Sequence, residues 1–456
     1  MTRLWFRKNL LMPTHAYLCI AVLATAPLWS QVAPSAEPAA SGPAPSDDQR
    51  MVTPAPVGGE GYSLAFSSEE RGNYLRGGLT LLSAYNDNLF TGTNGRPTSD
   101  VSYTIMPTIA LDLFRSRVDG TLSYSPGFTF YQKTSSDNES DHNLALNFKF
   151  RLSPHVNLSL RDSLQKTSNI FSQAILGPTP VSGSPQAPND SVIAPLASTL
   201  RNTAGVQIAY QFSADAMVGA GGTFSNLHYP NPAQVIGLSD QSSRGGSAFY
   251  NKRLASRHYV GVTYQYQMFL TSPNQIQNET QTHSVLLFYS VYVQPRLSVS
   301  FFGGPQHSDT EQIGLAASRA WSPSTGVSAG WQGVRSSIAA AYSRTITDGG
   351  GLPGAVHANT ASASLRQQLT RNLSAGLGAN YSINKVLDSL ISPNIGGHTI
   401  SGNVSLQYAF GQHFNVGLGY MRLHQSYGDI PAISNTPNRN QVSVSLGYQF
   451  RRPLGR

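Results

Sequence analysis

This chain has almost no cysteine and few charged residues. The single cysteine among 456 residues is Cys19, which lies in an N-terminal apolar stretch. If that stretch is removed, the mature protein has no thiol, which excludes disulfides, thiolate metal sites and a cysteine nucleophile. Lipidation of Cys19 is not expected, because Leu18 precedes it instead of a small residue. Charged residues make up 12% of the chain, about half of the roughly 25% found in ordinary soluble domains.

Long apolar runs and clusters of basic residues are also missing. Beyond the N-terminal stretch no 18 consecutive residues are apolar, which excludes a transmembrane helix there. The net charge of +8 falls to +5 without Arg3, Arg7 and Lys8, and it is spread along the chain, so no binding to nucleic acid is predicted. The 11 histidines are scattered, and neither a Gly-x-Ser-x-Gly elbow nor a phosphate loop occurs. We therefore predict no enzyme, no cofactor and no metal site.

What the chain does have is a strict alternation of apolar and small polar residues. In the last such segment Val442, Val444, Leu446 and Tyr448 alternate with serine, glycine and glutamine. Side chains of a β-strand point to opposite faces with a period of two, so one face is apolar and the other polar. Many segments of this kind, joined alternately by short turns and longer loops, are typical of a transmembrane β-barrel. The predicted fold class is all-β, a transmembrane antiparallel β-barrel in the cell outer membrane.

Composition divides the chain into four parts. Residues 1–31 combine basic residues with an apolar stretch and predict a cleaved signal peptide; an uncleaved anchor helix is the alternative. Residues 32–71 are rich in proline, alanine and serine and predict a disordered linker. Residues 72–450 are the predicted barrel, and 451–456 form a short basic tail.

The turns and loops between the alternating segments give a strand count. We find eight short turns and nine longer loops, which together imply eighteen strands. The range is 16 to 20, because the region 309–336 is ambiguous: Gln312–Ala320 can be read as strand instead of loop. A period of about 40 residues also occurs in propellers, but their blades have four short strands and recurring motifs that are absent here. The predicted turns are 115–117, 153–155, 213–215, 255–257, 294–296, 334–336, 370–372 and 411–413. The predicted loops are 91–98, 134–141, 169–198, 229–240, 271–280, 309–320, 348–357, 387–396 and 428–438.

An even strand number puts both ends of the barrel on one side, and the signal peptide makes that side periplasmic. Short turns then face the periplasm and long loops the exterior. The alternation also assigns an inner, lumenal face. Four basic residues on that face predict a mild preference for anions, with snorkelling at the interfaces as the alternative. The candidate pore-lining residues are Lys149, Arg151, Arg161, Arg366, Gln265, Gln267, Asn380 and Asn384.

Two features of the outer face carry further expectations. Asp162 falls on the lipid-facing side, where a charge is costly, so either a local bulge or a subunit contact is expected there. Aromatic residues close to the short turns predict a periplasmic aromatic girdle, with ordinary strand-end aromatics as the alternative. These are Phe114, Phe150, Phe212, Tyr259, Tyr292, Phe410, Phe414 and Phe450.

The longest loop, 169–198, is the third on the extracellular side. The layout resembles that of general porins, in which this loop folds inward and narrows the pore; a solvent-exposed flap is the alternative. Prolines stiffen the loop in either case. The candidate constriction residues are Pro178, Pro180, Pro185 and Pro188.

Two motifs resemble features of known families. The run Tyr85-Asn86-Asp87-Asn88-Leu89-Phe90 resembles a motif of the outer-membrane β-barrel porins associated with exopolysaccharide export. That resemblance implies a passive or polysaccharide-related pore and export components as partners. The ending Tyr448-Gln449-Phe450 resembles the aromatic last strand recognised by the outer-membrane assembly machinery, although six residues follow it here. Pro453 predicts that the strand stops near Arg451.

The leading hypothesis is a porin-like channel for passive diffusion or export of hydrophilic solutes, including oligo- or polysaccharides. A structural or docking barrel in an exopolysaccharide-export system, its lumen blocked by loops, is the second hypothesis. A surface adhesin is the third. The partners expected are outer-membrane lipid and the assembly machinery.

Overall fold

The computed structural model describes the chain from residue 72 onward, with gaps. The described residues are 72–89, 98–168, 189, 191–192, 197–232, 235–272, 277–312, 317–387, 395–428, 430, 433 and 438–454. The predicted signal peptide and the whole of the predicted linker therefore lie outside them.

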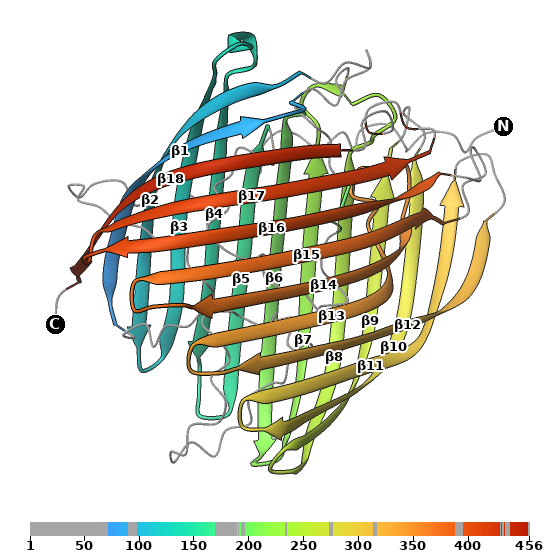
Figure 1. The fold of residues 1–456 in the computed structure, drawn as a ribbon. Coiled ribbons are helices and arrows are strands. Elements are labelled where there is room, and N and C mark those ends of the chain that lie inside the picture. The colour runs from blue at the N-terminus through green and yellow to red at the C-terminus, as the bar shows by residue number, and fades with distance from the viewer. Residues whose placement is uncertain are drawn as a thin grey trace, which may run out of the picture.

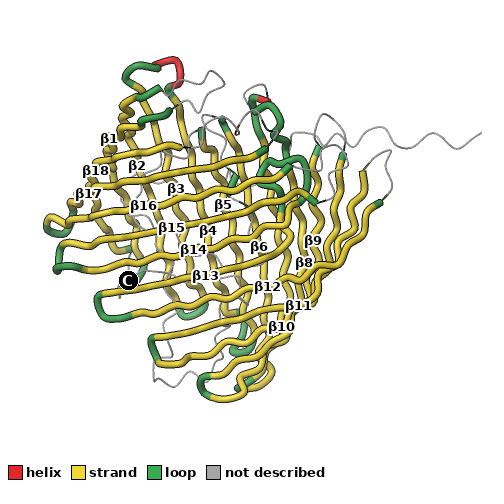
Figure 2. Tube along the Cα trace, turned by 45° about the vertical axis from the view of Figure 1, so that its right-hand side comes forward, coloured by secondary structure: helices red, strands yellow, loops and turns green. Residues whose placement is uncertain are grey.

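Eighteen strands make up nearly all of this part of the chain (Figure 2). The first nine are β1 (Tyr74–Asn86), β2 (Asp100–Arg115), β3 (Val118–Tyr131), β4 (Glu139–Arg151), β5 (Val156–Thr167), β6 (Thr199–Ser213), β7 (Ala216–His228), β8 (Gln241–Ala255) and β9 (His258–Thr271). The other nine are β10 (Asn278–Gln294), β11 (Leu297–Gln312), β12 (Ser318–Gln332), β13 (Ser336–Thr347), β14 (Val356–Gln368), β15 (Leu373–Val386), β16 (Gly396–Phe410), β17 (Phe414–Tyr427) and β18 (Asn438–Pro453). A 3₁₀ turn, η1 (Ser135–Asp137), lies between β3 and β4.

The sheet closes on itself. Each strand pairs antiparallel with the next, and β1 also pairs with β18 over thirteen residue pairs, from Tyr74 opposite Pro453 to Asn86 opposite Gln441. Closure leaves no free sheet edge at this junction, which a barrel in lipid requires. In Figure 1 the walls formed by β14–β18 and β5–β9 cross at a steep angle, as the tilted strands of opposite barrel walls do. The predicted eighteen-stranded antiparallel barrel is confirmed.

The outer face of the barrel is apolar with aromatic ends. Mid-strand leucine, valine and isoleucine side chains are exposed, for example Leu377, Val404 and Leu446 at 44%, 44% and 47%. Exposed aromatics lie toward the short turns, such as Phe410 and Phe414, and toward the long loops, such as Tyr85 and Tyr103. An apolar band between two aromatic girdles on a closed barrel is the pattern of an outer-membrane protein, and the protein is placed in the outer membrane accordingly.

No helix in the described residues has both the length and the hydropathy to cross a membrane.

Two strands extend beyond the ends predicted for them. β11 continues to Gln312 and β12 starts at Ser318, so the connection predicted as 309–320 contains strand at both ends. Polar residues occur on both faces there because these strand ends rise above the apolar band.

Part of the predicted girdle is wrong. Tyr259 and Tyr292 lie on the inner face, where their rings stack edge to face at 5.8 Å and pack with Met217 and Phe249. Their side follows from the alternation, since Val260 and Val262 point outward on the same strand. Phe212 and Phe410, by contrast, are exposed at 49% and 55%, because they occupy the outward positions of their strands.

The expected bulge at Asp162 is also wrong. The pairing of β5 with β4 and β6 runs through Asp162 without a register shift. Its Oδ1 accepts a hydrogen bond of 3.1 Å from Nδ2 of Asn202 on the neighbouring strand. A local partner therefore satisfies this outward carboxylate in part. A subunit contact at this position stays a prediction.

The last strand runs two residues beyond its predicted end. β18 includes Pro453, which pairs with Tyr74 of β1, and the next residue, Leu454, donates its N–H to the carbonyl of Asn73 at 2.9 Å. β17 ends its pairing at Tyr448, so Pro453 has a neighbour on one side only. A proline fits such a one-sided position because its missing N–H is not required. Recognition of this strand by the assembly machinery stays a prediction.

The pairing between β12 and β13 covers only about half of the length of β12. Thr325–Gln332 pair with β13, whereas the earlier part of β12 pairs with β11 alone among the described ladders. The end of β13 turns into the lumen instead. Ile346 is 1% exposed and donates its N–H to Oε1 of Gln306 on the inner face of β11, at 3.2 Å. The connection to β14 is thereby aimed into the barrel.

Candidate functional site

The strand register places all eight candidate pore-lining residues on the inner face. Each alternates with outward residues of its strand, as Gln265 and Gln267 do with exposed Tyr264. Their environments differ. Lys149 and Arg151 are exposed and Arg161, Arg366 and Asn380 are half-buried, whereas Gln265 and Gln267 are 8% exposed and Asn384 is 1% exposed.

The basic residues near the periplasmic end come from two opposite walls. Lys149 and Arg151 lie on β4 and Arg161 on β5, while Arg366 lies on β14, half the circumference away in an 18-stranded barrel. Lys149 is in register with Asp119 of β3, which offsets its charge. Arg151, Arg161 and Arg366 thus give this part of the lumen its positive charge.

Two acidic residues of the inner face lie close to the extracellular end. Glu139 accepts a hydrogen bond from the Tyr131 hydroxyl at 2.8 Å, and Asp141 accepts one from the Ser168 N–H at 2.8 Å. Each of these carboxylates holds a neighbouring strand end or loop residue. They organise the extracellular rim, whereas the acidic residues near the short turns, Asp112 and Asp119, lie opposite basic partners, Arg76 and Lys149.

Described residues near the end of the longest loop lie against the far wall of the lumen. Asn189 and Ser191 belong to the connection between β5 and β6, yet they bond to β15 and β16 on the far wall. Asn384 accepts from Nδ2 of Asn189 at 3.0 Å, and its own Nδ2 donates to the hydroxyls of Ser191 and Tyr427, each at 2.7 Å. The Thr399 hydroxyl donates to the Ser191 carbonyl at 2.7 Å. These bonds hold the chain across the width of the barrel.

The segment between β13 and β14, residues 348–355, meets this loop inside the lumen. Asp348 Oδ1 accepts the N–H of Asn189 at 2.8 Å, and Gln241 of β8 donates its side-chain amide to the Leu352 carbonyl. Gly351 has φ 109°, a conformation that glycine adopts without strain. It lies beside Tyr229, whose pKa burial raises well above its usual value.

An apolar cluster joins the three loops that enter the barrel. Every member is at most 8% exposed, and the cluster unites the loops after β5, β13 and β17 with the inner faces of β14, β15 and β17. Such burial is uncommon for extracellular loops, which usually lie in water. We call these lumenal segments the plug. The cluster comprises Val192, Leu352, Val356, Ala358, Val386, Tyr427, Ile430 and Ile433.

The candidate constriction prolines, Pro178, Pro180, Pro185 and Pro188, lie outside the described residues. The described residues near the end of their loop, Asn189, Ser191 and Val192, lie in the lumen. Sequence reasoning missed the contributions of 348–355 and of the loop after β17. Apolar residues in segments that were interpreted as polar loops, such as Leu352, Ile430 and Ile433, are the signal that could have found them.

The described part of the chain contains no group of three or more histidine, cysteine, aspartate or glutamate side chains arranged to hold a metal ion. The chemistry available in the lumen is therefore that of hydroxyls, amides and separate charges. Such groups can bind and orient a hydrophilic solute.

No family model matches this chain, and no curated protein matches it. Solved structures do resemble it. Pseudomonas aeruginosa OpdK with vanillate is 10% identical, with 83% of this chain and 99% of that chain covered and a TM-score of 0.40. P. aeruginosa OccK2 (OpdF) is 12% identical, with 83% and 98% covered and a TM-score of 0.42.

The FrpB iron transporter from Neisseria meningitidis is 9% identical, with 83% of this chain and 68% of that chain covered and a TM-score of 0.44. The architecture of this chain rests on its own strand pairing and burial. It is an 18-stranded outer-membrane β-barrel whose extracellular loops enter the lumen.

Proposed function

We propose that this protein is a porin-like channel for passive diffusion of small hydrophilic solutes, narrowed by the plug. The observation that carries the proposal is the polar inner face of a closed 18-stranded barrel. Barrels of 16–18 strands are wide enough for an aqueous channel. Inward polar residues such as Arg151, Arg161 and Asn380 are exposed or half-buried, and such residues favour water over packed apolar side chains.

The solute class we propose is small anions and neutral polar molecules. Arg151, Arg161 and Arg366 are positive groups on two opposite walls of the periplasmic half. Rings of basic side chains favour anion passage. Asn189, Ser191 and Val192 occupy the extracellular part of the lumen against β15 and β16, which limits the size of solute that can enter.

Liposome swelling tests this function. Proteoliposomes of the refolded barrel should swell in small sugars and small carboxylates and more slowly in cationic amines of equal size. No swelling in any solute, although electrophoresis shows a folded barrel, would refute the channel.

The plug favours a second candidate function. If it closes the lumen, the protein is a structural or docking barrel, and the resemblance of the Tyr85–Phe90 motif suggests an exopolysaccharide-export system as its context. Deletion of the gene would then abolish exopolysaccharide secretion and leave the uptake of small solutes unchanged. Unchanged exopolysaccharide secretion together with reduced uptake of small solutes would support the channel.

A further inference from the structure

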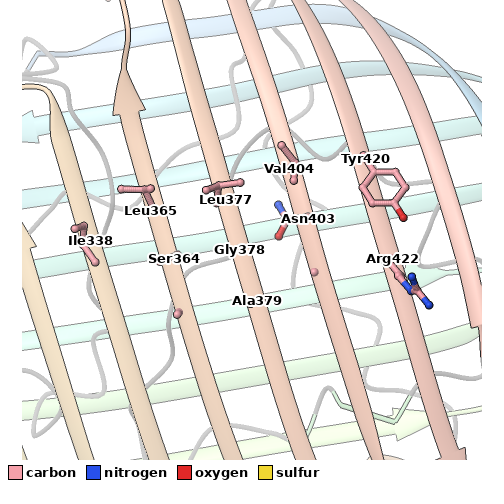
Figure 3. A pocket seen from close by; sticks show the side chains of 12 residues that line it. Ile338, Ser364, Leu365, Leu377, Gly378, Ala379, Asn403, Val404, Tyr420 and Arg422 are labelled. Atoms are coloured by element: carbon pink, nitrogen blue, oxygen red, sulfur yellow. The ribbon is translucent and has the colours of Figure 1, made fainter.

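A hollow interrupts the lipid-facing wall of the barrel over β13–β17. Its volume is about 400 Å³. Small residues at outward positions, Ala363, Ala379 and Gly402, leave the space open, and larger apolar side chains border it. Figure 3 shows the lining residues, with the apolar Ile338, Leu365, Leu377 and Val404 on neighbouring strands and Arg422 beside Tyr420 on β17.

The hollow spans the middle of the membrane, and its Gly402 and Arg422 end reaches the outer leaflet. A strand crosses the hydrocarbon in about nine to eleven residues. Counted from the periplasmic end of each strand, Ala379 is the seventh residue of β15 and Arg422 the ninth of β17. An acyl chain that descends from the outer leaflet can therefore reach the hollow, and Arg422 lies near the boundary with the outer head groups.

A second hollow, of about 340 Å³, lies further toward the exterior on the same wall. Lys385 and His398 are among its lining residues. Each is the thirteenth residue of its strand from the periplasmic end, which is beyond the hydrocarbon. This hollow is at head-group depth, and its lining is more polar than that of the first.

The outward residues around both hollows are basic. Arg344, Lys385 and Arg422 are exposed, and the rings of His398 and His424 lie 5.4 Å apart. None of the described outward residues of β13–β17 is acidic. The wall of β10 and β11 differs, because Glu279, Asp309 and Glu311 point outward there.

We propose that this face of β13–β17 binds one phosphorylated, multiply acylated glycolipid of the outer leaflet. The apolar hollow takes an acyl chain, and Arg422, Lys385 and the histidine pair bind the phosphates. Guanidinium and ammonium groups form strong charge-assisted hydrogen bonds with phosphate oxygens, and basic pockets at head-group depth bind anionic lipids. The proposal does not depend on the channel function.

Two other occupants fit less well. A phospholipid of the inner leaflet would have its head group at the wrong end of the strands. A second copy of the chain would make a two-fold contact that uses the same patch twice, and five basic residues would face their own copies. Like charges brought together in this way oppose association.

Native mass spectrometry of the detergent-purified barrel provides the test. The probes are bisphosphorylated lipid A, enzymatically dephosphorylated lipid A, and phosphatidylglycerol. We expect the unaltered barrel to retain one bisphosphorylated lipid A and to bind the other two at least tenfold more weakly. The double variant Lys385→Gln, Arg422→Gln should lose about tenfold in affinity for bisphosphorylated lipid A.

Two further variants separate charge from shape. Gly402→Leu keeps every basic residue but fills the apolar hollow; a Cβ at position 402 meets only the Gly378 carbonyl oxygen, at 3.8 Å, so the barrel tolerates it. It should also weaken retention. Arg244→Gln is the matched control, because Arg244 is an exposed outward arginine on β8, outside the basic wall.

Several results would overturn the proposal. These are equal retention of phosphatidylglycerol or dephosphorylated lipid A, unchanged binding by the double variant, or an equal loss with Arg244→Gln. Dimers cross-linked through Ala379→Cys would also overturn it, because a second copy would then cover the hollow. Heat-dependent electrophoretic mobility checks that each variant is folded.

Discussion

The two ends of the lumen follow the same alternating pattern and end in different environments. At the extracellular end, inward polar residues such as Asn384 and Thr399 are each 1% exposed and bonded to loop residues. At the periplasmic end, Lys149 and Arg151 are inward, polar and exposed. Three loops supply the difference, since their apolar residues pack inside one end of the barrel. An inward polar residue is therefore a pore-lining residue only where no loop covers it.

The comparison also separates two roles for polar side chains. Near the extracellular end, amides and hydroxyls hold the plug and set its position. Near the periplasmic end, charged groups interact with the solutes and ions that pass through the lumen. The first role should respond to substitution through pore size and stability, and the second through ion selectivity.

Removing the plug should have the largest effect. Replacing residues 349–354 and 189–192 each by Gly-Ser takes away the segments that meet inside the lumen, so single-channel conductance should rise severalfold. Deleting 134–137, which form the connection between β3 and β4 that includes η1, is the control and should leave conductance unchanged. An equal conductance for the unaltered protein, the plug-replaced variant and the control would mean that the plug does not narrow the pore.

Loosening the plug should have an intermediate effect. Asn384→Ala leaves the buried groups of Asn189, Ser191 and Tyr427 without their shared partner, at a cost of about 1–3 kcal/mol for a group left unsatisfied. We expect frequent switching between two conductance levels in planar-bilayer recordings. Asn380→Ala, on the same strand and face but half-buried, should record like the unaltered protein. Identical traces for both variants would rule out the clamping role of Asn384.

Neutralising the periplasmic charges should have the smallest effect. Arg161→Gln and Arg366→Gln together should reduce the anion-to-cation permeability ratio about twofold, because basic groups in a pore favour anions. The reversal potential in a salt gradient measures this ratio. Arg244→Gln, which alters an outward-facing arginine, should not change it. A shift of the same size in the control would point to surface charge instead of the lumen.

The barrel itself could be predicted from the sequence because its signal is local. Period-two alternation and turn composition depend on neighbouring residues alone, so the strand number follows from counting. The wrong predictions concern residues whose face is predicted from their proximity to a short turn instead of from the alternation. Their proximity to short turns predicts Tyr259 and Tyr292 in the girdle, although the alternation of β9 places Tyr259 inside.

The plug could be predicted only in part. The length of the loop between β5 and β6 indicated a constriction, but its contacts with β15 and β16 join residues some 200 positions apart in sequence. The position of the far wall depends on barrel closure, which no local pattern contains. The Gly349–Gly351 run and the apolar Leu352 are local marks of the second plug segment, and their meaning depends on the same closure.

The central claim is that this barrel conducts through a lumen narrowed by its own loops. Single-channel recording of the unaltered, refolded barrel in the presence of sugars of increasing size tests it most directly. The account predicts small, discrete conductance steps that fall when small sugars enter the pore and recover fully with sugars too large to enter. No steps at all, or steps as large as those of the plug-deleted variant, would contradict it.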